Sequence, residues 1–268
     1  MPAEDSLGAY YPPDYAPFET AIKLERSRVQ RWDRHYGMIK RRRVIERYIS
    51  TGSILDVGCA TGNFLAEMKQ TGRWQTAGIE PDARAAAYAM KEHQLAVQVG
   101  LLRDIPLPAE QYDVITLWNV LEHVPSPVSE LRRLVAALRP GGIIVFSLPN
   151  LESYEVRLFG NRWFCWELPR HVCFFPATLV RDIVRDLGLT FEESTCVSGA
   201  QVAFNLSLQY LYSDRTNAPT WHRVTYRAFT SRVGRVALFP VFFLIGALRQ
   251  GMIVTHVARK GFGLSQAD

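Results

Sequence analysis

Short apolar runs alternate with helix-like stretches along most of the chain. The runs predict seven strands, at 54–57, 76–79, 95–99, 112–117, 143–148, 190–197 and 252–258. Apolar residues three or four positions apart predict helices between them, at 64–70, 81–92, 126–138 and 178–187. Unbroken apolar strands separated by helices are typical of parallel strands joined by crossover helices. The sequence therefore predicts an α/β fold whose mostly parallel sheet is flanked by helices.

Two further segments flank this predicted core. From Thr20 to Tyr48 the apolar spacing predicts one or two helices with a break at Gly37 and with the arginines on the outside. A second helix-like, apolar segment separates the sixth and seventh strands. We therefore expect an aromatic segment and helical cap at 1–50, a core at 51–198, a helical insertion at 199–250, and the last strand and tail at 251–268.

The composition is that of an ordinary globular protein, with 48% hydrophobic and 21% charged residues and a net charge of +5. These values exclude a largely disordered chain. Much of the positive charge lies in residues 23–47, where Arg41, Arg42 and Arg43 are consecutive. A solvated helix face is the first interpretation of such a run, and contact with nucleic acid or an anionic membrane is the alternative.

The cysteine pattern and the N-terminus predict a cytoplasmic location. The four cysteines form no CxxC pair, and the first residues lack the basic and then apolar pattern of a secretory signal. The apolar run at 236–248, which contains Pro240, is shorter than the roughly 20 residues of a membrane-spanning helix. It has three interpretations: a buried helix, the lining of a pocket for a lipid-like acceptor, or a helix in the membrane interface beside Arg227, Arg232 and Arg235. The third would place the protein peripherally on the inner face of the membrane.

The chemistry of the chain centres on a glycine turn between the first strand and its helix. A dinucleotide-binding turn has the pattern G-x-G-x-x-G, which lets the backbone approach a pyrophosphate. Here Ala60 replaces the second glycine between Gly58 and Gly62, and Asp56 precedes the turn. A carboxylate in this place repels a diphosphate and suits the ammonium group of an amino-acid moiety. The turn therefore disfavours a nucleotide diphosphate cofactor.

A second acidic residue, Glu80, ends the second predicted strand. A carboxylate there can accept hydrogen bonds from both hydroxyls of a ribose, as an adenosine-type cofactor requires. Each feature alone is common in structural roles. The ordered set of turn, acid and later strand predicts a cofactor with both an adenosine and an amino-acid part.

Four motifs together resemble those of class I S-adenosylmethionine-dependent methyltransferases, namely residues 56–62, 78–81, 112–115 and 138–142. Residues 119–125, Asn-Val-Leu-Glu-His-Val-Pro, resemble a branch that includes ubiquinone-biosynthesis O-methyltransferases and bacterial methyltransferases of glycan and natural-product pathways. A looser similarity at 169–176 extends the match, whereas 199–250 matches no motif. The resemblance implies a Rossmann-like, seven-stranded, mostly parallel sheet and S-adenosylmethionine as the methyl donor.

The resemblance also implies roles for single residues. The glycine turn would curl around the methionine part, Asp56 would reach its amino group, and Glu80 would hold the ribose. The adenine would lie between Pro81 and Leu101, and Trp118 with Asn119 would face the methyl group. The implied cofactor-binding residues are Asp56, Gly58, Cys59, Ala60, Thr61, Gly62, Glu80, Pro81, Leu101, Trp118 and Asn119.

Methyl transfer is an in-line displacement, so the protein mainly aligns the acceptor and removes its proton. His123 is the candidate general base because the ordinary pKa of an imidazole lies near neutrality. His171 is the second candidate. The alternative is that Glu122 and His123 only brace the turn into the next helix.

The long connection at 149–176 and the N-terminal aromatic segment are the candidate acceptor-binding regions. Aromatic and basic side chains alternate in the connection, and connections of this length are usually functional. The candidate acceptor-binding residues are Trp163, Trp166, Arg170, Phe174 and Tyr11. Core packing is the alternative for the aromatic residues. A metal site of Cys165, His171 and Cys173 is a further alternative, but its spacing matches no structural zinc pattern, so no metal is expected.

The resemblance thus implies methyl transfer to a small-molecule, glycan or lipid-linked acceptor, at an oxygen atom. A scaffold protein that binds S-adenosylmethionine without turnover is the alternative. A nicotinamide-dependent enzyme would share only the α/β topology. A nucleic-acid substrate is disfavoured, because no Asn/Asp-Pro-Pro-Tyr sequence follows the fourth strand. No oligomeric state is indicated.

Overall fold

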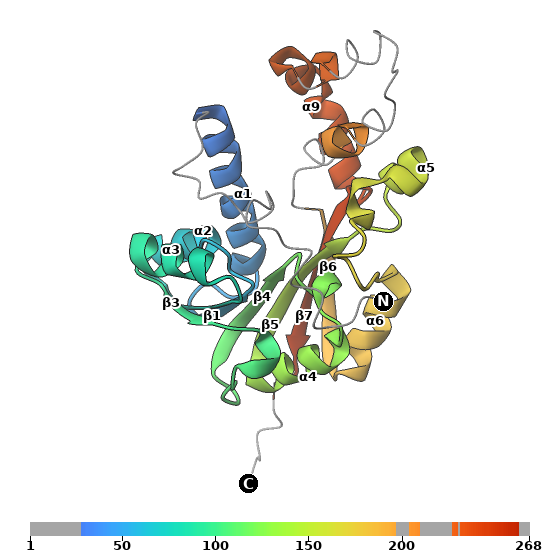
Figure 1. Ribbon diagram of the computed structural model, residues 1–268. Coiled ribbons are helices and arrows are strands. Elements are labelled where there is room, and N and C mark those ends of the chain that lie inside the picture. The colour runs from blue at the N-terminus through green and yellow to red at the C-terminus, as the bar shows by residue number, and fades with distance from the viewer. Residues whose placement is uncertain (1–27, 197–203, 210–226, 230, 263–268) are drawn as a thin grey trace.

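The computed structural model describes residues 28–196, 204–209, 227–229 and 231–262, and Tyr11 lies outside these residues. A single seven-stranded sheet forms the centre of the molecule (Figure 1). Its strands are β1 (Gly52–Val57), β2 (Trp74–Glu80), β3 (Ala96–Val99), β4 (Tyr112–Trp118), β5 (Leu138–Pro149), β6 (Leu189–Thr195) and β7 (Ile253–Lys260).

The strand order in the sheet is β3-β2-β1-β4-β5-β7-β6. The first five strands in this order pair in parallel, and β7 is antiparallel to both β5 and β6. The predicted mostly parallel, seven-stranded sheet is confirmed. The chain order reverses between β1 and β4, and ligands of open α/β sheets bind at such a reversal, beyond the carboxyl ends of the strands.

Helices cover both faces of the sheet (Figure 1). The helices of the described residues are α1 (Arg28–Glu46), α2 (Asn63–Gln70), α3 (Ala83–His93), α4 (Pro127–Ala137), α5 (Tyr154–Phe159), α6 (Ala177–Asp186) and α9 (Arg232–Ala247), of which α5 and α9 lie beyond one end of the sheet. Short 3-10 turns are η3 (Leu102–Asp104), η4 (Leu121–His123), η5 (Gly160–Arg162) and η6 (Phe164–Trp166). One apolar cluster includes residues of α1, α2 and α3, and another includes residues of α4 and α6. The sheet is therefore the middle of three layers.

Helix α1 differs from the prediction in two respects. It continues through Gly37, where a break was expected. Glycine lowers helix stability by only about 1 kcal/mol relative to alanine, and the burial of Met38 and Ile45 against the sheet outweighs that cost. The arginines are also not all on the outside, because Arg42 donates to Glu67 of α2 over 2.9 Å and contacts Glu46. Side-chain contacts thus fix α1 against α2.

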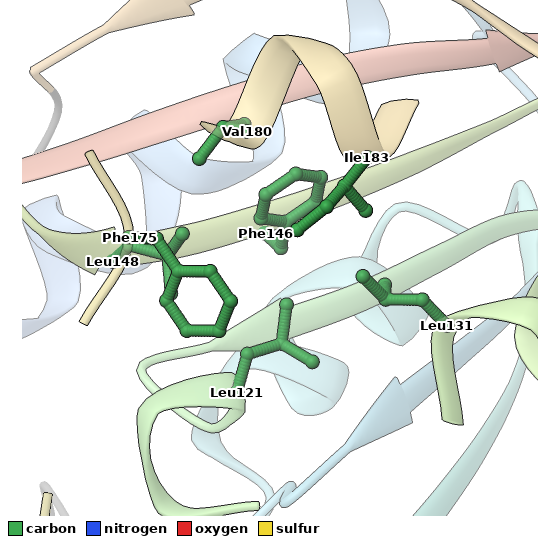
Figure 2. Close-up of a pocket in the computed structure, with 7 residues that line it drawn as sticks. All are labelled: Leu121, Leu131, Phe146, Leu148, Phe175, Val180 and Ile183. Carbon is green, nitrogen blue, oxygen red and sulfur yellow. The ribbon is translucent and has the colours of Figure 1, made fainter. Parts of the chain in front are cut away.

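The side of the sheet that carries α4 and α6 holds a small apolar pocket beneath η4. Figure 2 shows its lining, which comes from η4, α4, β5, α6 and the residue Phe175. The lining residues are Leu121, Leu131, Phe146, Leu148, Phe175, Val180 and Ile183. Because it lacks a polar group that could orient a ligand, we assign this pocket to the core that supports η4.

Candidate functional site

The glycine turn follows β1 at the point where the chain order reverses. Gly58, Ala60 and Gly62 all have positive φ angles, of 70°, 48° and 75°. A Cβ at Gly62 would lie 2.5 Å from Leu95 Cδ1, and one at Gly58 would lie 2.7 Å from Val120 Cγ2. Gly62 is the N-cap of α2, and no side chain caps that helix end. The turn therefore requires glycine at both ends and leaves backbone N–H groups of α2 available to a ligand.

Ala60 occupies the left-handed conformation at the position where the motif has glycine. Its Cβ makes this conformation unfavourable by about 1–2 kcal/mol. Ala60→Gly removes this strain. It also makes the unfolded chain more flexible, which lowers the free energy of unfolding by about 0.4–1 kcal/mol. We expect a net rise of roughly 1–4 °C in the melting temperature of the ligand-free protein, measured by thermal unfolding. A lower melting temperature would show that the Ala60 methyl group makes a stabilising contact.

The two predicted carboxylates both lie at this edge of the sheet. Asp56 is buried and accepts a hydrogen bond from Thr116 Oγ1 over 2.6 Å. Glu80 is also buried, and its two oxygens accept from the backbone N–H groups of Ala60, over 2.7 Å, and Asp82, over 2.9 Å. Burial raises the pKa of Glu80, and the two N–H donors oppose that rise. Glu80 thus holds the glycine turn in place while its remaining lone pairs stay available to a ligand.

The other two residues of the turn have different environments. The Cys59 side chain points into the core towards Gly78, and burial together with the nearby Asp56 raises the pKa of its thiol. This thiol is therefore inert, and its contribution to a cofactor site is limited to the backbone. Thr61 Oγ1 accepts a hydrogen bond from Asn63 Nδ2 over 3.0 Å, at the start of α2.

The predicted adenine-binding residues lie on neighbouring strand ends. Glu80 pairs with Val99 in the β2–β3 ladder, and Gly100 N donates to Glu80 O over 3.1 Å. Pro81 and Leu101 directly follow these strand ends and are exposed. Both residues thus lie just past the paired ends of β2 and β3, where exposed apolar side chains offer a surface to a flat ring.

Trp118 and Asn119, at the end of β4, have unequal access to this edge. Asn119 is exposed and left-handed, with φ 59°, which asparagine tolerates better than most residues. Trp118 is buried, packs edge-to-face on Phe64, and carries the Arg41 guanidinium 4.9 Å from its ring centroid. A cation of α1 therefore already lies against the ring expected to face the sulfonium. Nothing in the run of arginines at 41–43 indicates in the sequence that Arg41 contacts Trp118.

The two candidate bases meet next to η4. The 149–176 connection returns to η4, where Val172 N donates to Glu122 O over 2.8 Å. The rings of His123 and His171 lie 4.6 Å apart between centroids. His171 Nδ1 lies 2.7 Å from Cys165 O, and its Nε2 lies 3.3 Å from a Glu167 oxygen. Both predicted bases thus belong to one cluster, in which His123 is partly exposed and His171 is buried.

The Glu122 carboxyl group belongs to the same cluster. From the sequence, its expected role was only to brace the turn into the next helix. It is fully buried, and neither of its oxygens has a hydrogen-bond partner within the described part of the chain. Burial raises the pKa of Glu122 to about 8, and nearby Glu167 adds to this rise. Burial, together with His171, lowers the pKa of His123 to about 3. The only sequence signal was an acidic residue directly before the candidate base His123.

Glu122, His123 and His171 also form the one group of potential metal ligands found in the described ranges. Their ligating atoms all lie within 4.8 Å of one another. A carboxylate with two imidazoles is a donor set that zinc and related divalent ions use. This set shares only His171 with Cys165, His171 and Cys173, whose spacing in the sequence matches no zinc pattern.

The predicted acceptor-binding residues form an aromatic row beside this cluster. Ring centroids of Trp163 and Trp166 lie 5.2 Å apart, those of Trp166 and Phe174 lie 5.1 Å apart, and Phe174 lies 6.2 Å from His171. Trp163 is buried in an apolar cluster, whereas Trp166 and Phe174 are half-buried. Arg170 forms an ion pair with Glu167 over 2.9 Å. The structure thus brings these four residues together with both histidines.

The opposite pKa shifts of Glu122 and His123 predict how stability depends on pH. The pKa of Glu122 is raised from its ordinary value near 4.3, so stability falls as pH rises from about 4.3 to about 8. The pKa of His123 is lowered, so stability rises with pH from about 3 to about 6.5 and partly cancels this fall. Between about pH 6.5 and 8 the Glu122 effect is unopposed by His123. The fall in the free energy of unfolding that Glu122 causes is at most about 1.4 kcal/mol per pH unit.

Denaturant unfolding of the wild type and Glu122→Gln at pH 5 to 9 checks this prediction. We expect the stability difference, variant minus wild type, to increase with pH up to about pH 8 and then to stay constant. A constant offset in stability from the new amide leaves this slope unchanged. Parallel curves for the two proteins between pH 6 and 8 would show that Glu122 is ionised in the folded state.

Comparison with known proteins agrees with this arrangement. A family model described as a methyltransferase domain matches residues 30–194. The ubiquinone biosynthesis O-methyltransferase of Acinetobacter baumannii (strain AYE) is 33% identical over 156 residues, which cover 53% of this chain and 65% of that protein. The match therefore spans just under two thirds of the length of this curated relative.

Solved structures show the same fold at low sequence identity. An S-adenosylmethionine-dependent methyltransferase from Mesorhizobium loti has a TM-score of 0.55 and 17% identity, over 84% of this chain and 98% of that chain. The cyclase SpnF has a TM-score of 0.55 and 18% identity, over 84% and 81% of the two chains. The family match covers more than half of the chain and includes the glycine turn, Asp56, Glu80 and η4. The chain therefore belongs to the class I S-adenosylmethionine-dependent methyltransferase family.

Proposed function

We propose that this protein transfers a methyl group from S-adenosylmethionine to an oxygen atom of an acceptor molecule. The observation that carries the proposal is the position of the glycine turn, Asp56 and Glu80 together at the reversal of the sheet. S-adenosylmethionine supplies an electrophilic methyl group when bound. The protein's own task is then to hold the donor, orient the acceptor and accept a proton.

The residues at the carboxyl ends of the parallel strands would each bind a different part of the cofactor. Glu80 would accept the ribose hydroxyls, and Asp56 would attract the ammonium group from beneath the turn. Pro81 and Leu101 would contact the adenine from two sides. Asn119 would lie at the mouth of the site, and Trp118 would support it from below, because Arg41 covers part of its ring.

The buried cluster next to η4 is the proposed base. His123 is its partly exposed member and would contact the acceptor, whereas Glu122 lies behind it as a positioning residue. A pKa near 3 makes an isolated imidazole a weak base at neutral pH. Groups this close titrate as a unit, so a carboxylate form of Glu122 would stabilise a proton taken up by His123 or His171.

The acceptor is proposed from the relatives and from the aromatic row. The similar Acinetobacter baumannii protein is a ubiquinone biosynthesis O-methyltransferase by name, which favours methylation of a small molecule at oxygen. Trp166 and Phe174 are half-buried next to His171 and offer flat apolar surfaces to a ring or chain. Arg170 would meet an anionic group of the acceptor if that group replaced Glu167 as its partner.

Two measurements on the wild type test the proposal. Calorimetry with S-adenosylhomocysteine is expected to show one binding site, and absence of binding would refute a cofactor role for the sheet edge. Transfer of labelled methyl from S-adenosylmethionine into a cell extract is expected to mark a small-molecule product. Binding without any transfer would favour the alternative, a scaffold that retains the cofactor. Such an outcome is compatible with the fold, because the fold alone does not fix the activity: the structural neighbour SpnF, for example, is a cyclase.

A further inference from the structure

Helix α9 exposes an unusual amount of apolar surface. Residues 236–248 contain no charged side chain. Phe239, Phe243 and Leu248 are 65%, 68% and 62% exposed. Soluble monomers rarely expose a continuous apolar surface of this kind, and such surfaces mark contact with another protein or a membrane.

Within the described residues, α9 packs against the rest of the chain through Phe242. Phe242 contacts Phe204, with ring centroids 5.5 Å apart, whereas Phe239 stacks on Phe243 on the exposed side. A helix that is apolar around its circumference belongs in a protein core or a membrane. None of the helices in the described ranges is long and apolar enough to cross a bilayer. The surface of α9 therefore fits a helix that lies in a membrane interface.

The charges around α9 identify the kind of partner. Residues 227–250 contain four arginines and no acidic residue, and the arginines are at positions 227, 232, 235 and 249. Such a segment is complementary to anionic headgroups, which attract basic residues that flank an apolar helix. Two copies of the segment would instead bring positive charges together. Charge thus favours an anionic lipid surface over a second copy of this chain.

Helix α1 adds a second group of interfacial residues. Trp32 is 65% exposed and stacks on Tyr36, with centroids 5.4 Å apart, and Lys40 lies 5.3 Å from the Tyr36 ring. Tryptophan, tyrosine and lysine are the residues that proteins place at the membrane–water boundary. Figure 1 shows α1 and α9 projecting from the same end of the molecule.

That end is also the end at which the candidate site lies. Ile253, the first residue of β7, pairs with Pro149, the last residue of β5, so α9 is connected to the carboxyl edge of the parallel strands. Asp56, Glu80 and His123 belong to this same edge, where a bilayer that contacts α9 would lie.

We propose that α9 binds in the headgroup region of an anionic bilayer and holds the carboxyl edge of the sheet towards that surface. Phe239 and Phe243 insert between the acyl chains, and the arginines at the two ends of the helix contact headgroup phosphates. This inference concerns lipid contact and does not depend on methyl transfer. An acceptor carried on a lipid would reach the site from the bilayer, and that consequence alone rests on the proposed function.

Flotation of the full-length protein with lipid vesicles tests the proposal. We expect the wild type to float with vesicles that contain phosphatidylglycerol, to bind them less at high salt, and to bind vesicles of phosphatidylcholine alone poorly. The double variant Phe239→Gln/Phe243→Gln should lower binding about tenfold or more. Leu179→Gln is the matched control, because Leu179 is an exposed apolar residue of α6 and its replacement should leave binding unchanged.

Three results would overturn the proposal. The first is a wild type that does not float with anionic vesicles, and the second is a double variant that floats as well as the wild type. The third is size-exclusion chromatography that shows a dimer which the double variant dissolves, because α9 would then be covered by a second copy. Unchanged S-adenosylhomocysteine affinity in the double variant confirms that it is folded. Vesicle binding by a protein that lacks this affinity would refute the proposed function and leave the lipid contact standing.

Discussion

Replacing Glu80 by alanine is expected to weaken the binding of S-adenosylhomocysteine by about 100-fold. If Glu80 holds the ribose as proposed, the variant would lose two charge-assisted hydrogen bonds to the ribose hydroxyls, each worth about 1.5–3 kcal/mol. Two such bonds at the lower limit amount to about 3 kcal/mol, or roughly 100-fold in affinity. The variant also loses the acceptor that holds the Ala60 N–H at 2.7 Å, so the glycine turn becomes less ordered before the ligand binds. Titration calorimetry measures the affinity directly.

Two further variants separate these contributions. Glu80→Gln keeps one acceptor oxygen and the shape of the side chain, so its affinity should lie between those of the wild type and Glu80→Ala. Asp186→Ala removes an exposed carboxylate of α6, on the other side of the sheet, and should bind like the wild type. Equal affinity of Glu80→Ala and the wild type would show that the ribose is bound elsewhere, and it would remove the main support for the proposed cofactor site.

The arrangement of the residues proposed to bind the cofactor was predictable because its signals are local. The turn between β1 and α2, the acid at the end of β2 and the left-handed glycines follow from a few adjacent residues. Parallel pairing then places the carboxyl ends of β1 and β2 side by side, as the pairing of Asp56 with Gly78 shows. Alternation of apolar runs and helices was likewise sufficient for the sheet, including its seventh strand.

The arrangement of the residues proposed to bind the acceptor was only partly predictable, because it depends on contacts between distant segments. Nothing near residue 122 in the sequence indicates that Val172 binds its carbonyl oxygen, or that His171 thereby lies against His123. The contact of Arg41 with Trp118 is of the same kind, since it depends on how α1 crosses the sheet. The aromatic row was identified as a group, but its order in space, with Trp163 in the core and Phe174 next to His171, required the fold.

The position of the cluster also explains why composition alone could not assign the base. Imidazole titrates near neutral pH in water, which made His123 the natural candidate. Burial changes that ranking, because it lowers the pKa of both histidines and raises that of Glu122. A carboxyl group with a pKa of about 8 is a stronger base than an imidazole with a pKa of about 3. We therefore propose that Glu122, His123 and His171 take up a proton from the acceptor as a coupled unit, and not through one imidazole alone.

Replacing His123 by alanine is expected to lower methyl transfer by about 10²–10⁴-fold, the range that general bases contribute. The side chain is the partly exposed member of the cluster, so it is the one that can reach an acceptor proton. It belongs to η4 and not to the glycine turn or β2, so S-adenosylhomocysteine affinity should change less than about twofold. The measurements are labelled-methyl transfer into the product found with the wild type, and calorimetry on the same sample. His35→Ala, which removes an exposed histidine of α1, is the control and should leave transfer unchanged.

The variant Glu122→Gln distinguishes a role of Glu122 in proton transfer from a purely structural role. If Glu122 positions and supports the histidines, the variant should keep part of the activity, and the dependence of its transfer rate on pH should differ from that of the wild type. The reason is that the carboxyl group with a pKa of about 8 no longer takes part in the coupled titration. A role in bracing alone would lower the rate equally at all pH values, because the amide would only alter packing. Full activity in both His123→Ala and His171→Ala would show that the acceptor loses its proton to solvent, and the cluster would then be a structural feature of η4.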